Sequence, residues 1–122
     1  MSRTILTVDD STSMRQMVRA TLQSAGYAVV EASDGQEALE FARANRVDLV
    51  ISDVNMPGMD GIKLVGELRA LPAYRLTPLL LLTTESSQEK KLEGKRAGAT
   101  GWIVKPFNPA QLLATLNRLF AA

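Results

Sequence analysis

The chain has 122 residues, 46% of them hydrophobic, which suits one compact domain with its own core and leaves no room for a second. The formal net charge is +1 and the basic residues are scattered, apart from a short cluster at residues 90–96, so a nucleic-acid surface is not expected. Cysteine and histidine are absent, which excludes disulfides, thiolate chemistry, imidazole ligands and the commonest general base. Any metal would need oxygen ligands, which favours a hard cation such as Mg²⁺.

Strands and helices are predicted to alternate along the chain. Apolar runs predict five strands, at residues 5–8, 27–30, 49–51, 79–82 and 102–104. Each is followed by apolar residues at helical spacing. Five strand-and-helix pairs imply an α/β fold, with a five-stranded parallel sheet and helices on both faces, because right-handed crossovers place the helices there.

The first and fourth predicted helices differ in how much they should bury. The inward face of the first should consist of Met14, Met17, Val18 and Leu22. The fourth should start at a capping pattern of Ser86 with Glu89 and should bury little, since Leu92 is its only large apolar residue. The mixed charges of residues 89–96 are either a solvated face or a signalling surface on a weakly anchored helix.

Polar residues stand at the predicted carboxyl ends of four strands: Asp9 with Asp10, Asp53, Thr83 and Lys105. In a parallel sheet these ends share one edge, with neighbouring strands about 5 Å apart, so the side chains should meet if their strands are adjacent. Closely packed carboxylates repel one another, and a divalent cation on Asp10 and Asp53, with Asp9 acting through water, would answer that repulsion. Lys105 and Thr83 would supply a counter-charge and a hydrogen-bond donor for a phosphoryl group on Asp53.

These residues resemble a known family. The pair Asp9 and Asp10, the segment DVNMPGMDG at residues 53–61, Thr83 and the pair Lys105–Pro106 are similar in order and spacing to the receiver domain of two-component response regulators, over the whole chain. The resemblance implies the flavodoxin-like strand order 2-1-3-4-5. It also implies that Asp53 accepts a phosphoryl group from a phosphohistidine on a sensor histidine kinase of the chemotaxis type, and the lack of histidine here fits a donor on another protein.

The resemblance assigns further roles at the same edge. Asp9 and Asp10 would bind Mg²⁺ together with Asp53 and the backbone carbonyl of Asn55. Lys105 would pair with the phosphoryl oxygens, and the bond between it and Pro106 would be cis.

A conformational switch is also implied. Thr83 would move toward the phosphate and pull the following loop with it. In the family this movement is coupled to a tyrosine or phenylalanine on the fifth strand, and here that position is Trp102, which is either the switch residue or an ordinary core or surface aromatic. The output surface would be formed by the fourth helix, the fifth strand and the fifth helix.

The chain is expected to be a stand-alone receiver domain, residues 1–122, because it ends just after its last predicted helix. Such proteins bind a flagellar-motor switch when phosphorylated or relay phosphate to a histidine phosphotransfer protein. The run VDDSTSMRQ, with Asn55 and Glu85, is most similar to the chemotaxis type. With no signal peptide and no long apolar span, the protein is expected to be cytoplasmic and monomeric, without membrane insertion.

Three other functions fit the residues less well. An aspartate-nucleophile phosphatase usually has an acid two residues after the nucleophile, where this chain has Asn55, an amide that cannot shuttle a proton. A stoichiometric phospho-acceptor with slow self-dephosphorylation is therefore expected, rather than an enzyme. A flavodoxin shares the fold, but the carboxylates of residues 9–10 would repel the flavin phosphate without a metal. A receiver that only docks is disfavoured, because every acidic position is filled.

Overall fold

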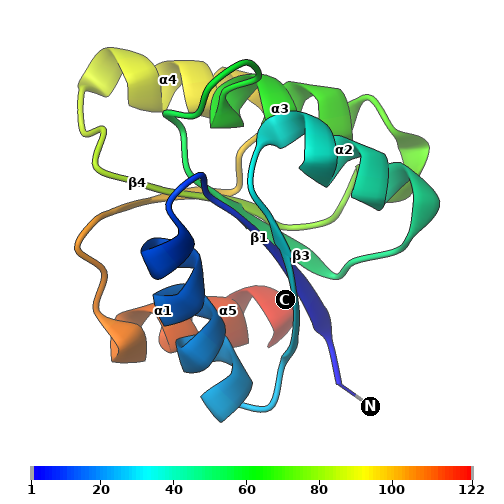
Figure 1. Ribbon diagram of the computed structural model, residues 1–122. Helices are drawn as coiled ribbons and strands as arrows, with labels where there is room; N and C mark the ends of the chain where they lie inside the picture. Colours follow the sequence, from blue (N-terminus) through cyan, green and yellow to red (C-terminus); the bar gives the residue numbers. More distant parts are fainter. Residues whose placement is uncertain (1, 122) are drawn as a thin grey trace.

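The computed structural model describes residues 2–121 as a parallel five-stranded sheet between two layers of helices (Figure 1). The strands are β1 (Thr4–Val8), β2 (Ala28–Ala32), β3 (Leu49–Ser52), β4 (Leu79–Thr83) and β5 (Gly101–Val104). The helices are α1 (Thr12–Ser24), α2 (Gly35–Ala44), α3 (Gly61–Arg69), α4 (Gln88–Ala97) and α5 (Pro109–Ala121), with a short 3₁₀ turn η1 (Pro72–Tyr74). The strand order β2-β1-β3-β4-β5 is the flavodoxin-like order that the resemblance implies.

The sheet is buried on both faces. Figure 1 shows α1 and α5 on one side and α2, α3 and α4 on the other. Side chains alternate between the two layers along each strand: in β4, Leu79 and Leu81 pack toward one cluster, and Leu80 and Leu82 toward the other. A strand buried on both faces has no polar side, which explains why the strands read as continuous apolar runs. No helix within residues 2–121 is long and apolar enough to cross a membrane.

The inward face of α1 is narrower than predicted. Val18 and Leu22 are buried and Met14 packs against the same cluster, but Met17 is 56% exposed, so the prediction that it faces inward is wrong. Met14, Val18 and Leu22 succeed one another at intervals of four and form a single stripe. Met17 lies about 100° around the helix from Val18, which places it beside that stripe and in solvent.

The start of α4 also differs from the prediction. The N-cap is Ser87, whose hydroxyl accepts a backbone N–H of the first turn, and not Ser86. Glu85, just before it in the loop, is held by its backbone. Its N–H donates to Thr83 Oγ1 at 3.2 Å, and its carbonyl accepts from Trp102 Nε1 at 2.9 Å. These two hydrogen bonds keep the residues before Ser87 out of the helix.

The 3₁₀ turn η1 was not anticipated, and it supplies a buried anchor. Tyr74 is 1% exposed, and its hydroxyl lies 2.8 Å from the carbonyl oxygen of Ala42 and 2.6 Å from that of Asn45. The hydroxyl therefore ties the segment before β4 to the end of α2. A buried carbonyl that loses its donor costs free energy, because water cannot replace the bond.

We expect Tyr74→Phe to lower the free energy of unfolding by about 1–2 kcal/mol, because two carbonyls lose the donor they share. Urea unfolding followed by circular dichroism measures this change. Tyr27→Phe is the matched control, since the Tyr27 hydroxyl makes only a long, exposed contact of 3.4 Å with Asn117. It should change the free energy by less than about 0.5 kcal/mol. Equal losses in the two variants would contradict this role of Tyr74.

Candidate functional site at the carboxyl edge of the sheet

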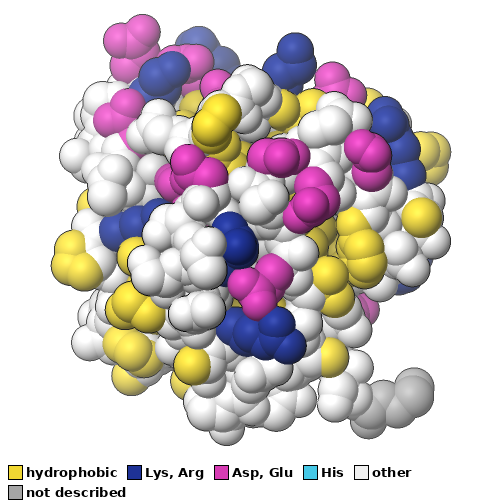
Figure 2. Space-filling model, viewed as in Figure 1, with side chains coloured by type: hydrophobic (Ala, Val, Ile, Leu, Met, Phe, Trp, Pro, Cys, Tyr) yellow, Lys and Arg dark blue, Asp and Glu magenta, His cyan; other side chains and the backbone are white. Residues whose placement is uncertain are grey.

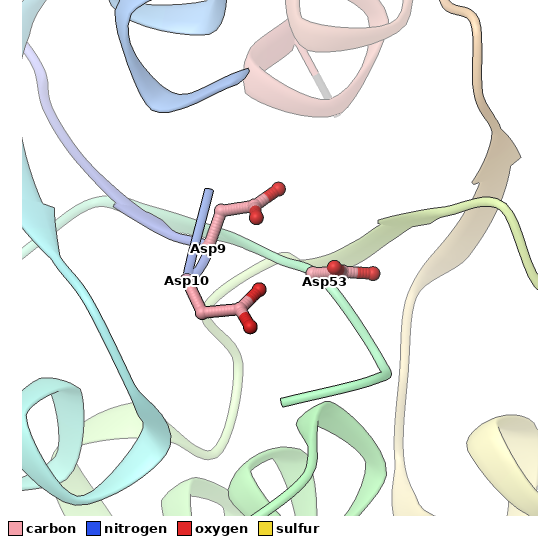
Figure 3. A group of neighbouring side chains, drawn as sticks. All are labelled: Asp9, Asp10 and Asp53. Carbon is pink, nitrogen blue, oxygen red and sulfur yellow. The ribbon is translucent and has the colours of Figure 1, made fainter. Parts of the chain in front are cut away.

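Asp9, Asp10 and Asp53 meet at the carboxyl edge of the sheet. The strands that carry them are neighbours, and their register pairs Val8 with Ser52, so the residues just after this pair lie side by side. One carboxylate oxygen from each acid lies within 4.8 Å of the others. Figure 3 shows the three carboxylates pointing into the same space beside the loops after β1 and β3. The acids therefore converge as their positions at the strand ends predict.

The three acids differ in exposure and in local support. Asp9 and Asp53 are 5% and 9% exposed, whereas Asp10 is open to solvent. Asp9 Oδ1 accepts the backbone N–H of Ser11 at 2.9 Å, and Asp53 Oδ1 accepts that of Val54 at 2.7 Å. Each buried carboxylate thus has one oxygen oriented by its own loop, while the exposed acid marks the side from which a ligand can enter.

Lys105 is the one cation that pairs with the carboxylates of these acids within residues 2–121. Its Nζ lies 2.7 Å from Asp9 Oδ2 and 3.4 Å from Asp53 Oδ2, with only 9% of its side chain exposed. Its backbone N–H donates to the carbonyl of Thr83 at 2.8 Å, which fixes the start of the side chain at the end of β5. The bond between Lys105 and Pro106 is cis, the isomer that the resemblance implies. One ammonium facing three carboxylates leaves the site with excess negative charge.

The donor set fits a hard divalent cation. All three converging groups are carboxylates, which are the ligands that Mg²⁺ prefers, and the exposure of Asp10 leaves room for the waters that this ion usually keeps. Asn55, the fourth predicted ligand, lies two residues after Asp53 in the same loop, with an exposed side chain. A cation here would also offset the charge that Lys105 leaves unbalanced.

The loop after Asp53 folds tightly back onto that residue. Gly61 N–H donates to the carbonyl of Val54 at 2.9 Å. A Cβ at Gly61 would overlap the backbone carbonyl of Asp53, so the close approach requires glycine. The glycine that ends the DVNMPGMDG segment therefore serves to hold the backbone of Asp53 in place.

Thr83 and Trp102 are connected through the backbone of Glu85. Thr83 is fully buried at the end of β4, and its hydroxyl accepts the N–H of Glu85. The indole N–H of Trp102 donates to the carbonyl of Glu85. The Trp102 ring is partly buried and lies against Gly94 in α4, where an added Cβ would come within 3.0 Å of the ring. The side chain of Trp102 therefore packs between its own strand, β5, and helix α4. Sequence reasoning missed the part played by Glu85, since a backbone contact leaves no side-chain signal.

A group of charged residues supports the β1–α1 loop and was also missed. Arg15 donates to the backbone carbonyl of Asp9 and pairs with Glu31 of β2 at 3.2 Å, and Arg19 pairs with the same carboxylate at 2.6 Å. Hydrogen bonding to Arg19 is the largest cause that lowers the pKa of Glu31, against the opposing effect of burial. In the sequence, the only indication of this group of charged residues was the spacing of Arg15 and Arg19, which places them on one face of α1.

On the face shown in Figure 2, acidic and basic side chains lie mostly over the upper part and the centre, where both signs occur side by side. The concentration of acids at the carboxyl edge is the feature of this region that calls for a ligand.

The fold and this arrangement of acids, lysine and threonine define a receiver class of signalling domain. Residues 5–117 match the model of the response regulator receiver domain, and the chain belongs to this family. It is similar to chemotaxis protein CheY-3 of Vibrio cholerae serotype O1, with 40% identity over 117 residues, which are 95% of this chain and 90% of that protein.

Solved structures agree with this assignment. The structure of chemotaxis response regulator CheY4 of Vibrio cholerae is 57% identical, with a TM-score of 0.92 over 98% of this chain and 99% of that chain. The receiver domain of sensor histidine kinase PA1611 from Pseudomonas aeruginosa PAO1 is 30% identical, with a TM-score of 0.92 over 100% of both chains. Its structure holds a magnesium ion coordinated in the active site cleft.

We expect Mg²⁺ to raise the free energy of unfolding by about 2.7 kcal/mol at a hundred times its dissociation constant, because the ion binds only the folded site. Asp10→Asn should be more stable than the wild type without Mg²⁺, since one repulsive charge is removed, and should lose most of the response to the ion. Urea unfolding with and without Mg²⁺ measures both effects. Glu40→Gln, at an exposed position of α2, should behave as the wild type. A full Mg²⁺ response in Asp10→Asn would argue against this site.

Proposed function

We propose that the protein is a single-domain response regulator that accepts a phosphoryl group on Asp53 from the phosphohistidine of a sensor histidine kinase, and that this change controls binding to a flagellar-motor switch in chemotaxis. The observation that carries the proposal is the convergence of the carboxylates of Asp9, Asp10 and Asp53, two of which pair with the ammonium of Lys105. The names of the similar proteins CheY-3 and CheY4 support the chemotactic role. The matched region of this chain spans 90% of CheY-3 and 99% of the CheY4 chain, which supports a single-domain architecture.

Asp53 would act as the nucleophile. Its Oδ1 is held by the N–H of Val54, so its Oδ2 is the oxygen that would attack phosphorus. The bond between phosphorus and the donor's imidazole nitrogen would break, its electron pair would return to the imidazole, and an acyl phosphate would form on Asp53. Proximity and orientation account for most of the rate in such a transfer, because the protein has little covalent chemistry of its own to perform.

Lys105 would follow the new charge. Its Nζ already lies 3.4 Å from Asp53 Oδ2, so a phosphoryl group on that oxygen would bring strong acceptors within its reach. The carboxylates of Asp9, Asp10 and Asp53 and the carbonyl of Asn55 would hold Mg²⁺. When bound, the ion supplies positive charge that offsets the phosphoryl oxygens during transfer.

Thr83 would transmit the effect of phosphorylation at Asp53 to β5 and α4. Its hydroxyl can donate to a phosphoryl oxygen while it still accepts from the N–H of Glu85. A movement of Thr83 toward Asp53 would therefore displace Glu85, whose carbonyl is bound by Trp102. Because the Trp102 ring lies against Gly94, the displacement would reach α4.

We assign the output surface to α4, β5 and α5. Among the five α-helices, α4 has the fewest buried residues, since only Gly94 is buried and Leu92 is 47% exposed, so we expect it to be displaced most easily. A pocket of about 250 Å³ lies between α4 and β5 and is lined by Trp102 together with Lys91 and Lys95. A change in Trp102 would alter the shape of this pocket directly.

Turnover of external substrates is not part of the proposal. A phosphatase needs an acid or base to protonate the leaving group and activate water, and the residue two positions after Asp53 is Asn55. The acyl phosphate would be lost slowly to water, so the protein would act as a stoichiometric phospho-acceptor.

Incubation with acetyl phosphate and Mg²⁺ should add the mass of one phosphoryl group to the intact protein. Asp53→Asn should gain none, and the wild type with a chelator should gain little, because the acids then repel the incoming phosphate. Glu40→Gln should be modified as fully as the wild type. Intact-protein mass spectrometry measures all four samples. No gain in the wild type, or an equal gain in Asp53→Asn, would exclude the proposed chemistry.

Phosphorylation should change the fluorescence of Trp102, which is the only tryptophan in the chain. We expect Thr83→Ala to be phosphorylated but to lose most of this change, because its side chain can no longer bind Glu85. Thr84→Ala is the matched control: the neighbouring threonine is exposed, and its loss should leave the signal intact. Emission spectra recorded on samples of known phosphoryl mass give the comparison. A full signal in Thr83→Ala would rule out the path through Glu85.

A further inference from the structure

A second concave site lies at the amino edge of the sheet, opposite the acids. It is a pocket of about 520 Å³ between the amino ends of β1, β3 and β4. Its lining comes from the residue before β1, residues 46–48, the turn at residues 72–78 and the end of α5. The phosphoryl-acceptor site uses none of these residues. We call this second site the amino-edge pocket.

The amino-edge pocket is basic. Arg3, Arg46 and Arg75 line it, and none of them forms an ion pair within residues 2–121. Asp48 is the only acid in the lining, and its carboxylate already accepts the backbone N–H of Thr4 at 2.7 Å. The three guanidinium groups therefore exceed the negative charge available in the pocket, which favours an anionic ligand.

Apolar side chains lie among the arginines. Leu76 stands at the rim and is 94% exposed, more than any other large hydrophobic residue among those described. Leu119 and Phe120 of α5 contribute to the wall, and the guanidinium carbon of Arg3 lies 4.2 Å from the centre of the Phe120 ring. A mixture of arginine with aromatic and aliphatic side chains is typical of the centre of a protein interface.

The turn at residues 72–78, which carries Leu76, is held in place by hydrogen bonds from Arg69. The guanidinium of Arg69 donates to the carbonyls of Tyr74 and Thr77, each at 2.7 Å, and Tyr74 is itself buried. Burial lowers the pKa of Arg69, whose charge is balanced by backbone carbonyls within residues 2–121 rather than by a carboxylate. Arg75 and Leu76 are thus exposed on a turn whose ends are fixed, and little ordering would be required on binding.

We propose that the amino-edge pocket binds an acidic peptide segment of a partner protein. Carboxylates of that segment would pair with Arg46 and Arg75, and an apolar side chain would lie between Leu76 and Phe120. Because the pocket and Asp53 are at opposite edges of the sheet, this contact would hold a partner without covering the site of phosphorylation.

The test uses the full chain, labelled with ¹⁵N, and a synthetic peptide with four glutamates around a central phenylalanine. We expect saturable shifts in the amide signals of residues 46, 75, 76 and 120. Replacing the glutamates of the peptide with glutamines should weaken binding at least tenfold. The double variant Arg46→Glu, Arg75→Glu should lose at least as much, and Leu76→Ser should weaken binding without any change of charge.

Lys63→Glu, Arg96→Glu is the matched control. It makes the same change in net charge at exposed positions of α3 and α4 that do not line the amino-edge pocket, and should bind the peptide as the wild type does. Modification of Asp53 by acetyl phosphate should be unchanged in the Arg46→Glu, Arg75→Glu variant, which also verifies its fold.

Three results would overturn the proposal. One is the absence of saturable shifts at millimolar peptide, and another is equal binding of the glutamate and glutamine peptides. The third is a response of the same amides to inorganic pyrophosphate but not to the peptide, which would make the pocket a site for small anions.

Discussion

The repulsion among Asp9, Asp10 and Asp53 governs the carboxyl edge of the sheet. The carboxylates of Asp9 and Asp53 are nearly buried, and the low dielectric around them strengthens their repulsion. They lie close together because the register of β1 and β3 pairs the residues that precede them, Val8 and Ser52. Lys105 offsets part of this repulsion. The remaining excess of negative charge favours a divalent cation at this edge.

The rest of the fold holds these groups in place. The sheet is buried on both faces, and the acids stand at the ends of strands that cannot shift without exposing their apolar side chains. Gly61 fixes the backbone of Asp53, and Arg15 with Glu31 fixes that of Asp9. The core is therefore what allows an electrostatically unfavourable cluster to persist.

In the proposed function, transmission away from this edge would pass through the backbone of Glu85, which the side chains of Thr83 and Trp102 bind. The N–H and the carbonyl of Glu85 are bound by residues of two different strands, Thr83 in β4 and Trp102 in β5. α4, which comes after this loop, buries only Gly94. A firmly held site next to a loosely held helix is the arrangement in which a small local displacement can produce a large change at the surface.

Periodicity predicted the alternation of strands and helices well, because the apolar runs of the central strands β1, β3 and β4 reflect burial on both faces of the sheet. The same signal says nothing about which strands are neighbours, and the strand order came from the family resemblance. The predictions for Met17 and Ser86 were wrong for local reasons. The buried stripe of α1 is narrower than its apolar residues suggest, so Met17 is exposed. The hydrogen bonds of Glu85 keep the loop before Ser87 out of α4, so Ser86 is not the N-cap. The acids at the strand ends could be found from the sequence, while the ion pairs of Arg15 and Arg19 with Glu31 depend on contacts between distant segments.

The most direct test of the proposed mechanism is a crystal structure of the protein with Mg²⁺ and beryllofluoride, a mimic of the phosphoryl group. We predict beryllofluoride on Asp53, the metal ion among Asp9, Asp10 and Asp53, and the ammonium of Lys105 moved from Asp9 to a fluorine. The hydroxyl of Thr83 should contact the mimic. Beryllofluoride absent from Asp53 at saturating concentrations, or Lys105 still paired with Asp9 beside the bound mimic, would contradict the mechanism.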